Sequence, residues 1–145
     1  MRIEVFLKHS PMFCVSQATR RFDSLTMRLL REDNLNFLEA LILSAMFFES
    51  PKLVKPSQLA TTLDATRGNV SHNISSLEAK GLIQRRLDRE DSRAYRLVLN
   101  PQGRKVAIQV IGVLDKLQRD FEDQVGKKEL ESSLRVISLL GSLRV

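Results

Sequence analysis

The spacing of apolar residues predicts a mainly helical chain. Val15, Ala18 and Phe22 begin a stripe at three- and four-residue steps, the spacing of one helix face. Ser10 and Pro11 stand before it as a typical helix start. Similar stripes predict long helices over 11–31, 35–49, 101–124 and 128–142. The second of these is apolar nearly all round, so we expect it to be buried.

The first nine residues show a different pattern. Ile3, Val5 and Leu7 stand apart from one another, with charged residues between and around them. This alternation predicts a short strand or an extended arm. Residues 1–9 are therefore interpreted as an N-terminal extension.

The middle of the chain predicts two short helices followed by a β-hairpin. Ser57 is expected to cap the first helix and Thr66 the second. The second helix should end near Lys80, with Gly81 as its stop. Two strand candidates, LIQRRL and RAYRLVL, flank an acidic turn. Two helices joined by a tight turn and followed by a hairpin describe a winged helix–turn–helix. The expected fold class is therefore mainly α with a small β-hairpin wing.

The second short helix separates an apolar face from a polar one. Val70, Ile74 and Leu77 follow core spacing, whereas the opposite face is expected to carry Arg67, Gly68, Asn69, Ser71, His72, Asn73 and Ser75. Long Lys and Glu side chains suit a solvent-facing helix better, but Asn, Ser and His can read base edges in the major groove of DNA. We therefore predict that this face binds DNA, together with Ser57 and Thr66 at the two helix starts. The alternative is a polar exterior helix without that role.

The hairpin concentrates charge. Arg85, Arg89 and Arg93 are its candidate DNA-binding residues, because a narrow minor groove favours arginine. Asp88 is expected to accept hydrogen bonds from backbone N–H groups of the turn. Asp91 is expected to hold the Arg93 guanidinium, which would then lose less entropy on binding. A solvent-exposed hairpin with weak local ion pairs is the alternative.

The distribution of charge supports this interpretation. The 145-residue chain has a formal net charge of +6. Residues 51–100 carry nine Lys and Arg against five Asp and Glu, a balance of +4. A basic centre between nearly neutral flanks is typical of a module that binds a polyanion.

Other functional classes find little support in the sequence. One cysteine and two separated histidines do not make a metal site. No Ser/His/Asp, Cys/His or paired-carboxylate arrangement indicates an enzyme, so we expect no catalytic residue and no cofactor. The longest apolar run, 40–48, is too short to cross a bilayer, and no signal peptide is visible, so a cytoplasmic location is expected. A protein-interaction module that does not bind DNA is the competing hypothesis.

Several short motifs in the middle of the chain occur together. They are Leu59-Ala60, Leu77 with Lys80-Gly81-Leu82-Ile83 and Arg85, then Asp88, Asp91 and Arg93, and finally Leu99-Asn100 with Gly103. In this order they resemble the DNA-binding core of the MarR (multiple antibiotic resistance regulator) family of bacterial transcription regulators. Asn100 replaces the family threonine, although both residues can cap a helix, and Ser92 replaces a common arginine. The resemblance extends over about residues 11–142.

The resemblance implies a homodimer that reads a pseudo-palindromic operator in double-stranded DNA, as a repressor or less often an activator. It implies a helical dimerisation region over 10–34 and 101–145 and a winged helix–turn–helix lobe over 35–100. The residues agree with this, because the helices outside the lobe carry more apolar surface than one small lobe can bury.

The resemblance also suggests how the protein is regulated. Family members commonly release DNA when a small aromatic or phenolic effector binds, and the side chains that could line such a site are Phe13, Phe22, Phe37, Phe47 and Phe48. Core filling is the simpler interpretation of each phenylalanine. A subgroup of the family senses organic hydroperoxides through a cysteine at the position of Cys14. Here Ala18 replaces a tyrosine of that subgroup, which leaves Ser10 and the helix N-terminus to influence the thiol.

Overall fold

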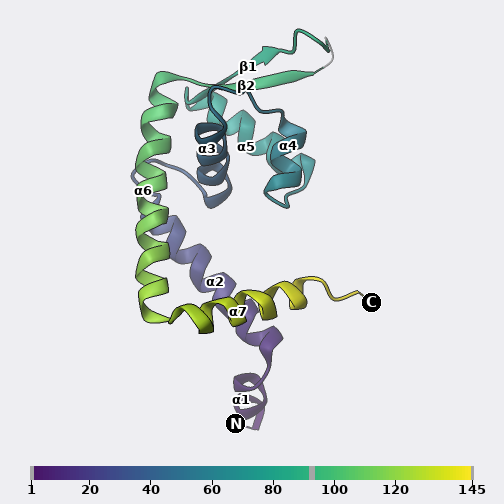
Figure 1. Cartoon of the computed structure of the whole chain (residues 1–145), viewed down its shortest axis with the longest axis vertical. Coiled ribbons are helices and arrows are strands. Elements are labelled where there is room, and N and C mark those ends of the chain that lie inside the picture. The colour runs from purple at the N-terminus through teal and green to yellow at the C-terminus, as the bar shows by residue number, and fades with distance from the viewer. Residues whose placement is uncertain (1, 92–93, 145) are drawn as a thin grey trace. The chain divides into compact units, whose positions relative to one another are not determined.

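The structure, a computed structural model, describes residues 2–91 and 94–144. Over these residues the chain forms helices and one two-stranded antiparallel sheet (Figure 1). In chain order the elements are α1 (Arg2–Lys8), α2 (Pro11–Leu29), α3 (Phe37–Glu49), α4 (Pro56–Thr62), α5 (Arg67–Ala79), β1 (Ile83–Leu87), β2 (Tyr95–Leu99), α6 (Pro101–Gln124) and α7 (Lys127–Gly141). The predicted fold class, mainly α with a hairpin wing, is confirmed.

The N-terminal residues form helix α1, so the prediction of a strand or extended arm was wrong. The apolar residues of this segment fit a helical spacing as well as the alternation of a strand. Ile3, Phe6 and Leu7 stand at helical three- and four-residue steps. The helix ends where the backbone N–H of His9 donates to the Phe6 carbonyl, 3.2 Å away. In so short a segment the two periods overlap, and the alternation alone did not decide between them.

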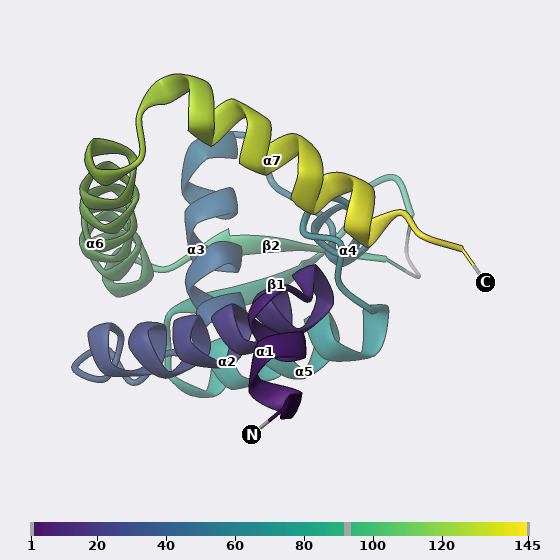
Figure 2. The ribbon, with the colours of Figure 1, turned by 90° about the horizontal axis from the view of Figure 1, so that it is seen from below.

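The winged lobe lies within a compact unit of residues 29–113, which holds the buried core. Within it α3 packs against α5 and β2, and α4 packs against α5. Figures 1 and 2 show these three helices grouped beside the hairpin. The largest fully buried apolar side chains are Leu30, Ile42, Leu43, Ile74, Leu77, Ile83 and Leu97. Helix α3 contributes two of them, which agrees with its nearly all-apolar sequence.

Helix α3 begins behind a capping box. Oδ1 of Asn36 accepts from the Glu39 backbone N–H at 2.8 Å, and Glu39 Oε2 accepts from the Asn36 backbone N–H at 2.9 Å. Two N–H groups that have no partner inside the helix are thereby satisfied. The predicted start at Leu35 was two residues early, because the Asn–Glu spacing was not recognised as a cap.

The wing is the antiparallel pair β1–β2, and both strand predictions are confirmed. Its register places Arg86 opposite Arg96. The hairpin also gains a contact from the loop before α4, because the Leu97 backbone N–H donates to the Val54 carbonyl at 2.9 Å. The middle of β2 is thus hydrogen-bonded to the loop that leads into the helix–turn–helix.

The junction between the wing and α6 depends on Gly103. A Cβ atom at Gly103 would overlap the carbonyl oxygen of Leu82. That oxygen accepts from the Asn100 backbone N–H at 2.9 Å, while Nδ2 of Asn100 donates to the Gly81 carbonyl at 2.9 Å. The end of β2 is therefore fixed to the start of β1, and the first turn of α6 lies against the same backbone.

The second compact unit, which we call the arm, comprises the described residues up to 28 and from 114 onwards. No residue of α1 or α7 is buried. The large apolar side chains that are exposed in the arm include Val5, Phe6, Met12, Phe121, Leu134, Ile137 and Leu139. Among the described helices, none is long and apolar enough to cross a membrane.

Candidate nucleic-acid interface

Helix α5 carries the predicted polar face. Oγ1 of Thr66 accepts from the Asn69 backbone N–H at 3.1 Å, so Thr66 caps the helix as predicted. Val70, Ile74 and Leu77 are fully buried against the lobe core. The exposed residues of the predicted polar face are Arg67, Gly68, Asn69, Ser71, His72 and Ser75. The core packing of α5 thus leaves Arg67, Gly68 and Asn69 at its start exposed, and likewise Ser71, His72 and Ser75.

Asn73 does not lie on that face, so the expected position of its side chain was wrong. Only 3% of Asn73 is exposed. Its Nδ2 donates to the Asn69 carbonyl at 2.8 Å and to the Asn69 Oδ1 at 3.0 Å, and its Oδ1 accepts from Nδ2 of Asn36 at 2.7 Å. Asn73 follows Val70 by three residues and precedes Ile74 by one, which turns it toward the core side of the helix.

Ser57 has a different local role from the one predicted. Helix α4 begins at Pro56 with Lys55 as its N-terminal boundary residue, and the Lys55 backbone N–H donates to Oε1 of Gln58 at 2.8 Å. Ser57 is therefore inside the first turn and does not cap the helix. Its side chain is exposed.

Arg85 is held against α5. Its guanidinium lies 3.0 Å from Glu78 Oε2, donates to Ser75 Oγ at 2.8 Å and stands over the Tyr95 ring at 5.1 Å from the centroid. Arg89 lies at the end of the hairpin and is exposed. Arg93 lies outside the described residues, and so does its predicted pairing with Asp91. The two described arginines among the wing candidates therefore differ, one tied to the lobe and one exposed.

Asp88 organises the turn end of the wing. It accepts from the Glu90 backbone N–H at 3.2 Å, which confirms the predicted role in the turn. It also pairs with Lys55 Nζ at 2.9 Å and Arg96 Nε at 3.1 Å, and only 5% of the residue is exposed. The hydrogen bond from Lys55, followed by those from the Glu90 backbone and Arg96, lowers the pKa of Asp88 to about 2 against the opposing effect of burial. Asp88 thus links the start of α4 to β2.

The charges of the hairpin sequence point to one of the two ion pairs of Asp88, the pair with Arg96. Arg86 and Arg96 are opposite each other, and like charges in that arrangement repel unless an acid lies nearby. Asp88 stands two residues after Arg86 and therefore on the same face of the strand. Lys55 comes from a loop more than thirty positions earlier in the chain, and no local pattern pointed to it.

The candidate redox residue, Cys14, lies near the start of α2. Cys14 is exposed on α2, with Sγ 4.0 Å from the carbonyl oxygens of Leu7 and Lys8. Ser10 Oγ accepts from the Phe13 backbone N–H at 3.3 Å, so it serves the helix start. Among the described residues, no group of three His, Cys, Asp or Glu side chains could hold a metal ion.

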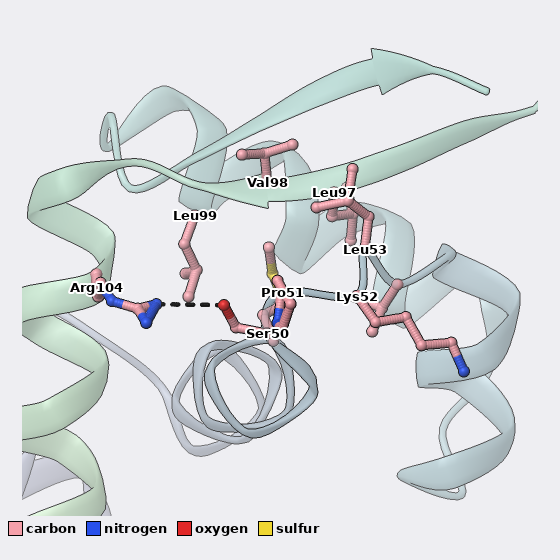
Figure 3. Close-up of a pocket in the computed structure, with 10 residues that line it drawn as sticks. Ser50, Pro51, Lys52, Leu53, Leu97, Val98, Leu99 and Arg104 are labelled. Carbon is pink, nitrogen blue, oxygen red and sulfur yellow. Dashed lines mark hydrogen bonds between the residues drawn. The ribbon is translucent and has the colours of Figure 1, made fainter. Parts of the chain in front are cut away.

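Two hollows of the lobe lie beside α3, and Phe48 lines the larger of them. The smaller hollow is a cavity of about 100 Å³ whose lining includes Ser50 and Arg104, and Nη1 of Arg104 donates to Ser50 Oγ at 3.4 Å. Figure 3 shows the Arg104 guanidinium pointing toward Ser50. Arg104 also stands over the Phe47 ring at 5.0 Å from the centroid. A larger groove of about 420 Å³ between α3 and α4 is lined by Ala45, Phe48, Glu49, Lys52, Val54, Gln58, Leu59 and Thr62. Of these two hollows, the larger groove falls within the range of roughly 300–1,000 Å³ that is usual for small-molecule sites.

Comparisons with known proteins agree with this geometry. A family model described as MarR family matches residues 33–94, which contain α3 to the end of the wing turn. The HTH-type transcriptional regulator PrsX of Escherichia coli is 26% identical over 98 residues, which cover 68% of this chain and 59% of PrsX. The match therefore spans less than two thirds of that relative.

Solved structures share the fold over nearly the whole chain. The structure of S. aureus MepR in complex with DNA has a TM-score of 0.84 at 19% identity and covers 92% of this chain and 98% of MepR. The transcriptional regulator BldR from Sulfolobus solfataricus has a TM-score of 0.72 at 27% identity and covers 94% of this chain and 96% of BldR. The matched lobe, the HTH-type relative and the shared fold agree: residues 33–94 match the MarR family, and the chain has the fold of solved transcription regulators.

Proposed function

We propose that this protein is a sequence-specific DNA-binding regulator that binds a pseudo-palindromic operator as a homodimer and acts as a ligand-responsive repressor. The observation that carries the proposal is the exposed N-terminal half of α5, where short hydrogen-bonding side chains lie beside a basic wing. A helix with that surface can enter the major groove and contact base edges. The likeness to MepR in its complex with DNA supports the same use of the fold.

The residues have separate roles in this proposal. Arg67, Asn69, Ser71 and His72 face base edges. Thr66, Gly68 and Ser57 stand at helix starts, where backbone N–H groups favour phosphate. Arg89 and Arg93 reach the minor groove, and Arg85 contacts DNA only from its fixed position beside Glu78. The burial of Asn73 removes it from the set of direct contacts.

The proposed homodimer rests on the exposed apolar surface of the arm. Helix α7 has no buried residue, and its apolar side chains Leu134 and Ile137 are 58% and 53% exposed. Phe121 near the end of α6 is 54% exposed. Apolar patches of this kind on a soluble chain mark an interface, and a two-fold arrangement would present two copies of α5 to successive major grooves.

The proposed effector is a small aromatic or phenolic molecule. The groove between α3 and α4 supports it, because its space of about 420 Å³ is lined by apolar side chains, Phe48 among them, together with a few polar ones that include Lys52 and Glu49. The experiment is retardation of a cognate duplex with and without a panel of phenolic carboxylates. Loss of the response in Phe48→Ala is expected. An unchanged response in that variant would remove this groove as the site.

The DNA-binding proposal is tested by selection from a pool of duplexes with a randomised centre, followed by binding measurements at two salt concentrations. We expect a two-fold symmetric motif and an affinity that falls steeply with salt. His72→Ala should relax the preference at one base pair by about 1–3 kcal/mol, whereas Arg89→Ala should weaken all sequences together. If the chain selects no motif and shows no salt dependence, the interaction-module hypothesis is favoured instead.

A peroxide-sensing regulator that acts through Cys14 is the alternative within the same fold. The exposure of Cys14 at the start of α2 supports it. In that case organic hydroperoxide should release the wild-type protein from DNA, and Cys14→Ser should abolish the release. A peroxide response that persists in Cys14→Ser excludes the alternative.

A further inference from the structure

Three asparagine side chains form a continuous hydrogen-bonded chain from the start of α3 to the exposed face of α5. Asn36 Nδ2 donates to Asn73 Oδ1 at 2.7 Å. Asn73 Nδ2 donates to Asn69 Oδ1 at 3.0 Å. Asn69 is exposed, whereas Asn73 in the middle is 3% exposed. We call this chain the asparagine relay.

Backbone groups fix the direction of the relay at both ends. The Glu39 backbone N–H can only donate, so Asn36 must turn its oxygen toward it and its nitrogen toward Asn73. The Asn69 backbone carbonyl can only accept, so Asn73 must turn its nitrogen toward Asn69. The two requirements agree. The orientation of each amide therefore follows from the network rather than from the shape of the side chain.

The relay decides which end of the Asn69 amide faces solvent. Its Oδ1 points inward to accept from Asn73, which leaves the Nδ2 amino group on the exposed face. A buried asparagine amide that lost its acceptor would carry an unsatisfied donor, a costly arrangement. The outward donor is thus maintained by contacts that lie behind the exposed face.

We propose that Asn36 and Asn73 are positioning residues that make Asn69 present a hydrogen-bond donor to the major groove, so that Asn69 selects guanine rather than adenine. The proposal rests on the proposed DNA-binding function. Guanine offers two adjacent acceptors, N7 and O6, in that groove. The usual asparagine–adenine pair needs the amide oxygen and nitrogen to face the base together, and here the oxygen faces Asn73.

The first test needs no DNA. Side-chain amide protons of the wild-type protein are assigned by NMR, and their exchange with solvent is compared. The Nδ2 protons of Asn73, and the one that Asn36 donates, should be protected, and those of Asn69 should exchange rapidly. Protection of the Asn69 amide protons would overturn the assigned direction of the relay.

The second test compares base preferences by selection from duplexes with a randomised centre. The wild type should prefer a G·C pair at one position of each half-site by roughly tenfold, a preference that Asn69→Ala removes. Asn36→Asp keeps a good helix cap but offers Asn73 an acceptor in place of a donor, so it should lose the guanine preference as well. Asn34→Asp is the matched control, because it adds the same charge two residues away at an exposed position, and it should keep the preference.

The outcomes distinguish the relay from the function on which it rests. If the wild type selects no motif, the proposed DNA-binding function fails. The relay proposal alone is overturned if the wild type selects a motif but Asn69→Ala loses the preference for an A·T pair, or loses no preference at any position. The same holds if Asn36→Asp retains the full guanine preference. Thermal melting of each variant establishes that it is folded, and Asn69→Asp, at an exposed position, provides a second variant that should also lose the preference.

Discussion

The ammonium of Lys80 lies 2.8 Å from Oε1 and 2.9 Å from Oε2 of Glu39, whose side chain is 2% exposed. Burial by itself raises the pKa of Glu39. Hydrogen bonds from Lys80, Ser76 and the Asn36 backbone, together with the Lys80 charge, outweigh it and hold the pKa below its ordinary value of 4.5. The pair joins the start of α3 to the end of α5, and it lies next to the asparagine relay.

Removal of the Lys80 charge should destabilise the lobe strongly. Lys80→Met leaves a buried carboxylate without its cation, which typically costs about 3–5 kcal/mol. Urea denaturation at neutral pH measures the loss. The control is Lys116→Met, which removes an exposed ion pair with Asp120 at 2.6 Å, and it should cost less than about 1 kcal/mol. Equal effects of the two variants would contradict the structural role of the Lys80–Glu39 pair.

The same pair predicts a dependence of stability on pH. The folded-state pKa of Glu39 is lowered, so its contribution is fully present above the ordinary value of 4.5 and is lost as pH falls through the lowered pKa. The difference in unfolding free energy between the wild type and Lys80→Met should therefore shrink in acid. A difference that stays constant from neutral pH down through the lowered pKa would show that Glu39 is not the group responsible.

Neutralising Asp88 should weaken DNA binding although it makes the wing more positive. Asp88→Asn keeps the shape of the side chain but removes the charge that pairs with Lys55 and Arg96. We expect a several-fold loss of affinity for DNA, because the wing becomes less ordered before binding. Glu90→Gln makes the same charge change at a side chain that is 87% exposed, so it should leave affinity unchanged or slightly higher. Tighter binding by Asp88→Asn would contradict the ordering role.

The pKa of Asp88 adds a condition to that prediction. Because the pKa is lowered to about 2 from 3.8, the ionised form and its contribution persist above pH 3.8 and are lost only as pH falls toward 2. The effect of Asp88→Asn on DNA affinity should therefore be the same at pH 6 and pH 8. Retardation assays at the two values provide the measurement.

A methyl group at Gly103 should destabilise the lobe. Gly103→Ala would force a Cβ into the Leu82 carbonyl, and such overpacking typically costs about 1–3 kcal/mol. Gly112→Ala is the matched control in the same helix, since a methyl group there would meet no described atom within 4 Å, and it should stabilise by up to about 1 kcal/mol. Thermal unfolding of both variants compares them. An unchanged unfolding temperature in Gly103→Ala would show that the backbone at Gly103 and Leu82 can shift at little cost.

A charge on α7 should dissociate the proposed homodimer. Ile137→Glu places a carboxylate on the apolar stripe that includes Leu134, where burial against a second copy would be costly. Arg135→Glu changes charge on another side of the same helix and should leave the dimer intact. Analytical ultracentrifugation should find a monomer only for Ile137→Glu. A wild-type monomer at micromolar concentration would contradict the dimer itself.

The sequence predicted those parts of the lobe that depend on local spacing. The cap at Thr66, the core positions Val70, Ile74 and Leu77, and both wing strands follow from residue types within one or two turns. The turn contact of Asp88 is also local. Predictions of this kind need no knowledge of distant neighbours.

The errors and omissions share a cause. Asn73 is polar and stands among exposed polar residues in the sequence, yet Asn36, the cap residue of α3, supplies the partner that makes its burial favourable. Glu39 is buried in the apolar helix α3, where Lys80, which follows α5, supplies its charged partner. Lys55 and Asp88 are likewise paired across the lobe. The burial of a polar residue can be predicted only when its hydrogen-bonding or charged partner is known. Each of these partners is more than thirty residues away in the sequence.

The ion pairs of the wing also affect the number of ions that are released when the protein binds a polyanion. Arg85 lies 3.0 Å from Glu78, and Arg96 lies 3.1 Å from Asp88. Each of these arginines thus carries a counter-ion that is part of the protein, and so it gathers few mobile anions and adds little to the number of ions set free when a complex forms. The number of ions released on binding will therefore be smaller than the number of arginines in the hairpin suggests, and the wing will contribute more through its shape than through its total charge.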